Sequence, residues 1–386
     1  MVPSIIAIAG ERDERYAEAI RRIWDQGDVF FPLDLRLSPA LQSSQLELVG
    51  AHAIMTTDGE LHLCEYGHRA MVQDGDAYIV LTSGTTGTPK AVIHTHQSVR
   101  SSVEASLAAL AFDPKTDRWI CALPPAHVGG LSVILRALHT RTPVDILSSF
   151  DPIAIEEAQR RGATHISIVR AALATVDISR FKTVLYGAQA PPSDLPKNVV
   201  TTYGMTETGS GVVYDGTPLQ GVEITFDETS SEILLRAPML ARAYGDGSSL
   251  TDRDGYFHSG DLGYFNDEGK LCVKGRITDV VNTGGEKVFP APVEELLESH
   301  PSVREAAIIG VPDPIWGELV TAVIVAEPTA STIPSLAELS ELIRAHFEPW
   351  VAPRQGFLAP SLPRTNLGKL QRNTLRTLIE QLPKLN

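Results

Sequence analysis

The sequence predicts an α/β fold in two parts. Residues 1–277 form a large N-terminal domain with mainly parallel sheets and an antiparallel portion, and residues 278–386 form a small mobile α+β domain. Two observations lead to this prediction. From about residue 70 to 205, short apolar runs alternate with helical patterns, which is typical of βα units in a parallel sheet. From about residue 219 to 275 the pattern becomes alternating and rich in turns, which is typical of antiparallel strands.

The parallel portion rests on a series of short apolar or β-branched runs. They span 77–81, 118–123, 143–147, 164–169, 182–187 and 198–204. Helical patterns lie between them at 98–110, 129–140 and 151–162. The last helix has the clearest limits, because Asp151 suits the N-cap, Pro152 the first helical position and Gly162 the end. Strands that are connected through helices are expected to run parallel.

The C-terminal part has a pattern of its own. Helices are expected at 292–300 and 335–347, and strands at 304–311 and 320–327. We place the boundary near Arg276 to Asp279, after the antiparallel portion. Within that portion, the turn Asn-Asp-Glu-Gly at 266–269 predicts a hairpin. The C-terminal part is large enough to have its own core.

Composition and charge limit the possible functions. Hydrophobic residues make up 43% of the 386 residues and charged residues 21%, as in globular proteins. The formal net charge is −14 and the chain has no dense run of Lys and Arg, which argues against binding to nucleic acids or anionic membranes. No apolar run is long enough for a secretory leader or a membrane span, so we expect no membrane insertion.

The cysteines indicate the redox compartment. Cys64, Cys121 and Cys272 are far apart in the sequence and show no C-x-x-C spacing. This pattern predicts neither a disulfide framework nor a zinc site. It fits a reducing compartment, so we expect a cytoplasmic protein.

The segment LTSGTTGTPK, residues 81–90, is a candidate phosphate-binding loop. Its glycines let the backbone turn N–H groups inward, and its hydroxyl groups and Lys90 offer further donors to anionic oxygens. It is not a Walker A loop, because Pro89 stands where that motif needs its second glycine and Ala91 follows the lysine. Taken alone, such a loop is more often a solvent-exposed turn.

Three further motifs carry candidate site residues. TTYGMTETGSG places an aromatic side chain, Tyr203, and a carboxylate suited to a hard cation, Glu207, beyond a strand end. In YFHSGDLGYF, Asp261 could accept hydrogen bonds from both hydroxyl groups of a ribose. In PRTNLGKLQRNTLR, Lys369 precedes a helix and could neutralise charge on a transferring group. Each residue also has a plainer interpretation, as a polar residue in a solvated turn or a lysine on the surface.

These motifs, in this order and at these spacings, resemble the adenylate-forming superfamily of acyl- and aryl-CoA synthetases, adenylation domains and luciferases. The resemblance covers most of the chain, from about 76 to 376. It implies an ATP site that is made by Thr82, Ser83, Gly84, Thr85, Thr86, Gly87, Lys90, Gly187, Ala188, Gln189, Tyr203, Gly204, Asp261 and Arg276. It also implies that Thr206 contacts the α-phosphate, Glu207 binds Mg²⁺, and Lys369 bridges the carboxylate of the acid and the α-phosphate.

The same resemblance implies two half-reactions and a C-terminal domain that moves between them. Lys369 serves the formation of the acyl adenylate, whereas the loop with Gly284 and Gly285 faces the active site when coenzyme A attacks. The hinge residue of the family is usually Asp or Lys and aligns here with Thr278, a departure that bears on the electrostatic bias of the hinge. Only 82 residues precede Ser83, so we expect a condensed N-terminal part and a small acid substrate.

The acid pocket is expected near four residues. His127 in PPAHVGG resembles the family residue that lines the acyl pocket and the coenzyme A tunnel, with a structural histidine as the alternative. Gly209 is expected beside the substrate. Within the family, the short chain and the segment TYGMTETGSGVVYDGTPLQGVEI are most similar to ligases for an aromatic dicarboxylic acid, whose second carboxylate needs a donor such as Arg136 or Arg170. The alternative for Arg136 is a side chain that extends from an apolar helix face to solvent.

The resemblance therefore implies an enzyme that ligates a small carboxylic acid to coenzyme A, with ATP and Mg²⁺, through an acyl adenylate. A homodimer is expected at the level of the family. Alternatives are another small aromatic or aliphatic acid, transfer to a carrier-protein thiol, and a non-catalytic binding protein of the same fold. Against the last, the chain retains Lys90, Glu207, Asp261, Arg276 and Lys369.

Overall fold

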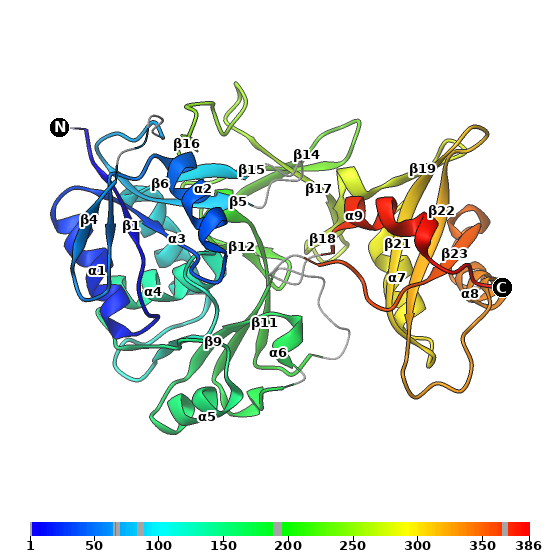
Figure 1. Cartoon of the computed structure of the whole chain (residues 1–386), viewed down its shortest axis with the longest axis horizontal. Helices are drawn as coiled ribbons and strands as arrows, with labels where there is room; N and C mark the ends of the chain where they lie inside the picture. Colours follow the sequence, from blue (N-terminus) through cyan, green and yellow to red (C-terminus); the bar gives the residue numbers. More distant parts are fainter. Residues whose placement is uncertain are drawn as a thin grey trace. The chain divides into compact units, whose positions relative to one another are not determined.

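The computed structural model describes residues 2–64, 66, 70–82, 89–173, 175–187, 195–364 and 370–386. In this part of the chain, the α/β fold predicted from the sequence is confirmed (Figure 1). The chain divides into two compact units. The large unit comprises Met1–Ile224, Leu234–His258 and Asp267–Leu271, and the small unit comprises Thr225–Ile233, Ser259–Asn266 and Cys272–Asn386.

The first sheet of the large unit has the strand order β16-β6-β5-β2-β1-β3-β4. The strands are β1 (Ile5–Ile8), β2 (Val29–Pro32), β3 (Ala53–Met55), β4 (Leu61–Leu63), β5 (Asp76–Thr82), β6 (Lys90–Thr95) and β16 (Ala243–Tyr244). Strands β3, β1, β2 and β5 are successively parallel, whereas β6 is antiparallel to β5. The sequence analysis does not predict β6. Its short apolar stretch at 91–93 is buried and pairs directly with β5, so the candidate phosphate loop joins two antiparallel strands.

The second sheet contains the predicted parallel series. Its order is β13-β12-β11-β10-β9-β7-β8. The strands are β7 (Trp119–Cys121), β8 (Val144–Ile146), β9 (His165–Ile168), β10 (Thr183–Tyr186), β11 (Val199–Gly204), β12 (Gly211–Tyr214) and β13 (Thr217–Pro218). Strands β7 to β11 pair in parallel, which confirms the prediction from the alternating helices and strands.

The helices of the large unit begin and end at recognisable signals. They are α1 (Glu14–Asp25), α2 (Pro39–Val49), α3 (His96–Ala109), α4 (Val128–Thr140), α5 (Pro152–Arg160) and α6 (Arg170–Leu173), with the short 3-10 turns η1 (Ile178–Arg180) and η2 (Thr206–Thr208). As predicted, Asp151 caps α5, and its carboxylate accepts a hydrogen bond from the N–H of Ile153 at 2.9 Å. Gly162 follows with φ of 101°.

The predicted antiparallel portion is a four-stranded sheet in the order β14-β15-β17-β18, and it carries residues of both units. Its strands are β14 (Glu223–Phe226), β15 (Glu232–Arg236), β17 (Phe257–Phe265) and β18 (Leu271–Arg276). The predicted hairpin turn joins β17 to β18, and Gly269 supplies the left-handed residue with φ of 71°.

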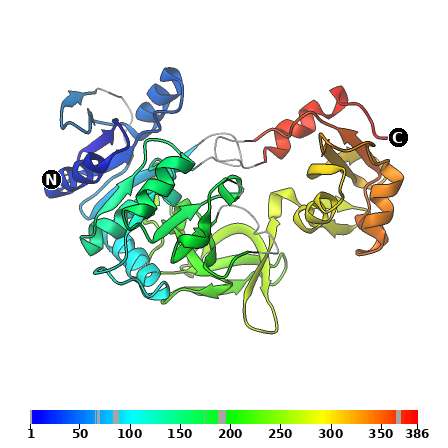
Figure 2. The same ribbon diagram turned by 90° about the horizontal axis from the view of Figure 1, so that it is seen from below.

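The rest of the small unit has its own sheet, in the order β20-β19-β22-β21 with β23 beside β22. Its elements are η3 (Ile277–Asp279), β19 (Val281–Thr283), β20 (Glu286–Val288), α7 (Pro290–Glu298), β21 (Val303–Asp313), β22 (Gly317–Ala326), α8 (Leu336–Arg344), η4 (Pro349–Val351), β23 (Gln355–Leu358), α9 (Arg372–Leu378) and η5 (Ile379–Gln381). Helices α7 and α8 pack on one face of the sheet and α9 on the other (Figure 2). Burial of both faces explains why β21 and β22 are almost continuously apolar.

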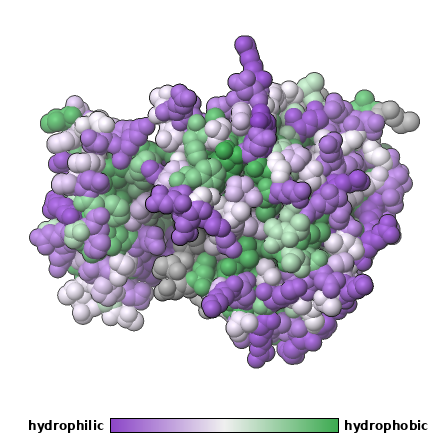
Figure 3. Space-filling view, turned by 180° about the vertical axis from the view of Figure 1, so that it is seen from behind, coloured by the Kyte–Doolittle hydropathy of each residue, from purple (hydrophilic) through white to green (hydrophobic). Residues whose placement is uncertain are grey.

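On the face of the molecule in Figure 3, hydrophilic side chains predominate and hydrophobic ones form separate patches. Among the residues that the structure describes, no helix combines the length and the apolar character that a bilayer crossing requires.

Helix α4 begins in close contact with the preceding chain. A Cβ atom at Gly130 would lie 2.4 Å from the carbonyl oxygens of both Leu123 and Pro124. At Gly129 the nearest atom would be a flexible one, Leu123 Cδ1, at 3.4 Å. The absence of a side chain at Gly130 therefore allows the first turn of α4 to approach the backbone of Leu123 and Pro124 closely.

We expect Gly130→Ala to destabilise the protein and Gly129→Ala to leave its stability unchanged or raise it. Helix propensity favours alanine by about 1 kcal/mol at either position, whereas the forced backbone shift at Gly130 costs about 1–3 kcal/mol. Urea unfolding of the two variants measures the difference. Equal shifts would show that the approach to the 123–124 carbonyls does not require glycine.

Two buried histidines are neutral for the same physical reason. His94 in β6 and His165 in β9 are at most 1% exposed. Burial lowers the pKa of each to about 4. At His165, Asp117 opposes the shift, while Lys182 and Arg136 add to it.

These histidines predict a loss of stability in acid. Because the unfolded chain binds a proton on each near pH 6.5 and the folded chain only near pH 4, stability falls as the pH drops through this window, by about 3 kcal/mol per histidine at most. His94→Gln removes one titrating group, so we expect a shallower fall between pH 6.5 and 4. Urea unfolding at several pH values tests this, and an unchanged slope would contradict it.

Candidate active site

The segment after β11 folds into a tight turn that holds two predicted site residues. η2 ends at Gly209, whose φ of 68° is in the left-handed region. The carbonyl oxygens of Thr206 and Glu207 accept hydrogen bonds from His94 Nε2 and from the N–H of Ala241, each at 2.8 Å. The turn lies at the carboxyl end of a parallel strand, which is where α/β proteins bind ligands.

Tyr244 on β16 links a predicted phosphate contact to the predicted metal ligand. Lys90 Nζ lies 4.9 Å from the centroid of the Tyr244 ring, and the Tyr244 hydroxyl donates to Glu207 Oε1 at 3.5 Å. Burial, assisted by the charge of Glu207, raises the pKa of Tyr244 to about 12, so the hydroxyl keeps its proton. The sequence analysis missed Tyr244, because only the pairing of β16 with β6 brings it here.

The structure places the ends of the candidate phosphate loop. Thr82 and Lys90 face each other as the last pair of the β5–β6 ladder. The remaining predicted loop residues, and three others, lie outside the described residues: Ser83, Gly84, Thr85, Thr86, Gly87, Ala188, Gln189 and Lys369. Their roles stay predictions.

Two predicted nucleotide contacts are glycines that the fold itself requires. A Cβ atom at Gly204 would lie 2.2 Å from the carbonyl oxygen of Ser210, and one at Gly187 would lie 2.6 Å from Thr202 Oγ1. Close packing therefore selects glycine at both positions, whether or not a nucleotide binds. Both lie with Tyr203 at the carboxyl ends of the adjacent strands β10 and β11.

In the small unit, the two predicted ribose contacts form one ion pair. Arg276 Nε lies 2.8 Å from Asp261 Oδ1, and Arg276 Nη1 donates to the carbonyl oxygen of Ser259 at 2.8 Å. The structure therefore confirms that these residues are neighbours and leaves their role as a prediction. Gly284 and Gly285, with φ of 60° and 89°, form the turn between β19 and β20.

His127 is held by two residues that the sequence analysis missed. Arg36 forms a bidentate ion pair with Asp34: Nε donates to Oδ1 at 2.8 Å and Nη2 donates to Oδ2 at 2.6 Å. Arg36 Nη2 also lies 3.0 Å from His127 Nε2. His127 Nε2 also lies 3.6 Å from Asp34 Oδ2, so the imidazole is next to both members of the Arg36–Asp34 pair. Burial alone would raise the pKa of Asp34, but the hydrogen bonds from Arg36 and His127 hold it well below its usual range.

The side chain of Arg136 is buried. The alternative interpretation from the sequence, in which it extends from the helix to solvent, is therefore wrong. Its side chain is only 1% exposed, and it lies over the Trp119 ring at 5.0 Å. Within the described part of the chain, its hydrogen-bond partners are hydroxyl groups, namely those of Ser106 (2.9 Å), Ser132 (3.2 Å), Ser210 (2.9 Å) and Tyr214 (3.3 Å). None of the described residues offers it a carboxylate.

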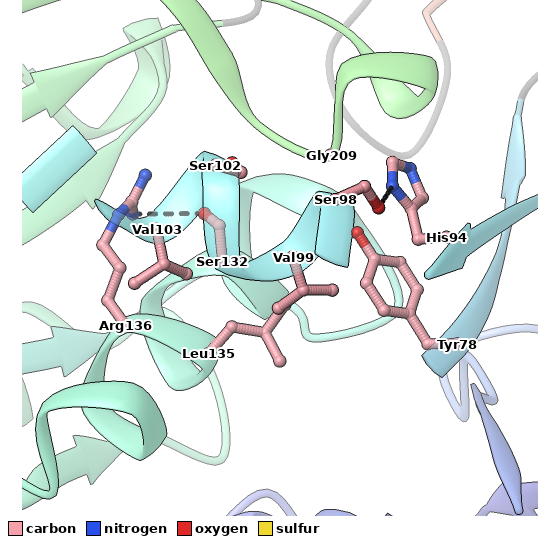
Figure 4. A pocket seen from close by; sticks show the side chains of 10 residues that line it. All are labelled: Tyr78, His94, Ser98, Val99, Ser102, Val103, Ser132, Leu135, Arg136 and Gly209. Carbon is pink, nitrogen blue, oxygen red and sulfur yellow. Dashed lines mark hydrogen bonds between the residues drawn. The ribbon is translucent and has the colours of Figure 1, made fainter. Parts of the chain in front are cut away.

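A small cavity lies beside this guanidinium (Figure 4). Arg136, Ser132 and Ser102 line one end of it, and Tyr78 and His94 line the other. Helices α3 and α4 form its walls, and Gly209 adjoins the second end. The cavity therefore joins a buried cation to the turn that carries Thr206 and Glu207.

The predicted acid-pocket residues thus separate into two groups. Arg136 and Gly209 line the same cavity, whereas Arg170 is exposed at the first position of α6. The sequence analysis missed the three hydroxyl partners from other elements: Ser106 is in no quoted motif, and the motif segments that contain Ser210 and Tyr214 do not mark them as partners of an arginine. Only the buried position of Arg136 on an apolar helix indicated that such partners were needed.

Two family models match the chain. The AMP-binding enzyme model matches residues 67–232, and the model of the AMP-binding enzyme C-terminal domain matches residues 292–369. The 2-succinylbenzoate–CoA ligase of Listeria monocytogenes is 30% identical to the chain, with 96% of this chain and 88% of that protein covered. The probable 2-succinylbenzoate–CoA ligase of Mycobacterium tuberculosis is 33% identical, with 79% and 85% covered.

The similarity extends to solved structures. The o-succinylbenzoate CoA synthetase (MenE) from Bacillus subtilis in complex with the acyl-adenylate intermediate OSB-AMP is 26% identical and superposes with a TM-score of 0.83, covering 97% of this chain and 88% of that chain. The complex of the same protein with ATP and magnesium ion has a TM-score of 0.84 at 26% identity, with 97% and 89% covered.

Proposed function

We propose, from the premise that this chain belongs to the AMP-binding enzyme family, that it is an ATP-dependent 2-succinylbenzoate–CoA ligase of menaquinone biosynthesis. The names of its relatives support the proposal, as does the similarity to the structure with OSB-AMP. The observation that carries the choice of acid is the similarity to the structure with OSB-AMP. Arg136, a buried guanidinium with hydroxyl partners beside a cavity with room for about one water molecule, is the candidate donor to the second carboxylate.

The charge of Arg136 favours an anionic group beside it, for which the cavity would have to widen, because it has room for about one water molecule. A cation that is removed from water is costly unless an anion and hydrogen bonds compensate it. Hydroxyl groups and the Trp119 ring compensate Arg136 in part, and the described residues supply no anion. The second carboxylate of 2-succinylbenzoate would complete the compensation through charge-assisted hydrogen bonds. A monocarboxylic acid would leave the charge unpaired.

The reaction then proceeds in two steps that need no protein nucleophile. The reacting carboxylate attacks the α-phosphorus of ATP and releases pyrophosphate, and the thiolate of coenzyme A attacks the resulting acyl adenylate and releases AMP. The protein acts by positioning and by electrostatic stabilisation. In this proposal Thr206 and Lys369 stabilise charge at the α-phosphate, and His127 lines the route of the thiol.

The side chains present suit a magnesium ion that arrives with the nucleotide. Within the described part of the chain, no group of three or more His, Cys, Asp or Glu side chains is placed to hold a metal. Mg²⁺ does not need such a group, because it is usually bound by one or two carboxylates together with substrate phosphates. Glu207 would provide the carboxylate, and the ion would offset phosphate charge.

The proposal has three further parts: a hinge, a cytoplasmic location and a homodimer. The hinge between the 1–277 and 278–386 domains is placed near Thr278, which lies in the short turn η3. A cytoplasmic location is supported by the three cysteines, which are all free. A homodimer is supported by the family resemblance alone.

The proposal predicts a ranked preference among acids. With ATP, Mg²⁺ and coenzyme A, we expect AMP release to be fastest with o-succinylbenzoate and slower with benzoate, 4-chlorobenzoate, acetate and hexanoate. Lys369→Ala should lower adenylate formation by about two to three orders of magnitude, with less effect on thioester formation from preformed acyl adenylate. A preference for a monocarboxylic acid would exclude the proposed substrate, and equal losses in both half-reactions would exclude the role of Lys369.

We expect Arg136→Met to lower kcat/KM for o-succinylbenzoate by about 10- to 100-fold, the loss of a charge-assisted hydrogen bond, and to leave kcat/KM for benzoate nearly unchanged. Methionine is apolar and fills much of the same volume, but it leaves the four hydroxyl partners without the guanidinium, so we expect a loss of stability. The comparison of the two acids on the same folded variant separates this loss from an effect on binding. Arg170→Met is the matched control at the exposed first position of α6 and should have no effect. If Arg136→Met affects both acids equally, Arg136 does not bind the second carboxylate.

A further inference from the structure

His94 belongs to none of the sequence motifs, yet it lines the cavity and contacts the turn that carries Thr206 and Glu207. Its ring is stacked on Tyr78 of the adjacent strand, with ring centroids 4.8 Å apart and planes 17° apart. The two rings form one end of the cavity beside Arg136 (Figure 4). A Cβ atom at Gly209 would lie 3.1 Å from His94 Cε1, so the ring packs directly on the backbone of the turn.

The contacts of His94 determine where its proton lies. Nε2 is 2.8 Å from the carbonyl oxygen of Thr206, which can only accept, so Nε2 carries the hydrogen. Nδ1 lies 3.2 Å from the Ser98 hydroxyl, whose single proton goes either to Nδ1 or to the carbonyl oxygen of Thr95 at 3.0 Å. The buried ring is neutral, and the bond from Nε2 specifies its orientation. Such buried hydrogen bonds preorganise the groups that they hold.

The bond to Thr206 fixes the first peptide of the turn. The second is fixed by the N–H of Ala241, which donates to the carbonyl oxygen of Glu207 at 2.8 Å. With both carbonyl groups held, the backbone at Thr206 and Glu207 has little freedom, although these residues are only partly buried. The carbonyl oxygen of Thr206 also accepts from the N–H of Gly209 within the turn at 3.0 Å, so the bond from His94 is the one that ties this peptide to β6.

We propose that His94 is a positioning residue for adenylation: its Nε2–H group ties to β6 the turn that presents Thr206 and Glu207 to the nucleotide, while the same ring closes one end of the cavity beside Arg136. The inference rests on the proposed function for the roles of Thr206 and Glu207. It assigns to His94 a link between the cavity and the turn, because a ring displaced from the cavity also loses the bond that ties the Thr206 carbonyl to β6.

The variants His94→Gln and His94→Asn distinguish a role of the hydrogen bond to Thr206 from a role of the packed ring alone. Glutamine places its amide nitrogen near the position of His94 Nε2 and can donate to Thr206, whereas asparagine reaches only the position of Nδ1, near Ser98. We expect His94→Asn to weaken binding of Mg·ATP, measured by calorimetry without acid, and to slow pyrophosphate release about 10- to 100-fold, as for residues that orient metal ligands. His94→Gln should stay close to the natural protein in both measurements. Thioester formation from preformed acyl adenylate should change less.

Several results would overturn the proposal. Equal losses in the two variants would show that the ring acts by its volume, and an unimpaired His94→Asn enzyme would show that the bond to Thr206 is dispensable. If the asparagine variant does not fold, ¹⁵N spectra of the natural protein decide instead. They must show His94 with its proton on Nε2 and a signal that shifts when Mg·ATP is added. A proton on Nδ1, or a signal that Mg·ATP leaves unchanged, would exclude the proposed role.

The test is independent of the identity of the acid. If the natural protein releases pyrophosphate with none of the acids, the proposed function fails. Mg·ATP binding by the two variants and the histidine spectrum still decide whether His94 positions the turn.

Discussion

The buried guanidinium of Arg136 is the constraint on which the interior of the large unit depends. A cation in this position requires donors, acceptors and aromatic surface to be arranged around it, because an unsatisfied buried charge costs several kcal/mol. Its partners come from α3, α4, β7 and the chain around β12. One side chain thus ties a helix pair to the second sheet, beside a small cavity whose lining is mostly apolar. The same electrostatic demand would favour an anionic group next to Arg136.

The candidate site residues are positioned by hydrogen bonds from residues outside the motifs. His94 restrains the carbonyl of Thr206, Tyr244 donates to Glu207, and Arg36 orients His127. Each supporting group is neutral or, for Arg36, neutralised by a carboxylate, so none adds net charge near the place where phosphate would bind. An enzyme that works by positioning needs this rigidity, because small displacements of its donors lower the rate strongly.

The small unit meets a different requirement. A domain that is expected to change position during the reaction needs a core that does not depend on its partner. Helices on both faces of the β21–β22 sheet provide two apolar clusters. Within this unit, Arg372 at the start of α9 forms two ion pairs. Its Nη2 lies 2.5 Å from Glu294 Oε1 of α7, and its Nε lies 3.8 Å from Asp279 Oδ2 of η3. These ion pairs connect the proposed hinge segment to α9.

The sequence by itself determined the α/β class, the parallel series β7 to β11, the limits of α5 and the identity of the motif residues. These features depend on local signals, namely the periodicity of apolar residues, capping residues and residue spacing. Only the tertiary structure decided that β6 runs antiparallel to β5, that Arg136 is buried among hydroxyl groups, and that Asp34, His94 and Tyr244 support the site. The physical reason is that each of these depends on partners from distant segments: Arg136 and Tyr214, or His94 and Thr206, meet only because the strands and helices between them pack together.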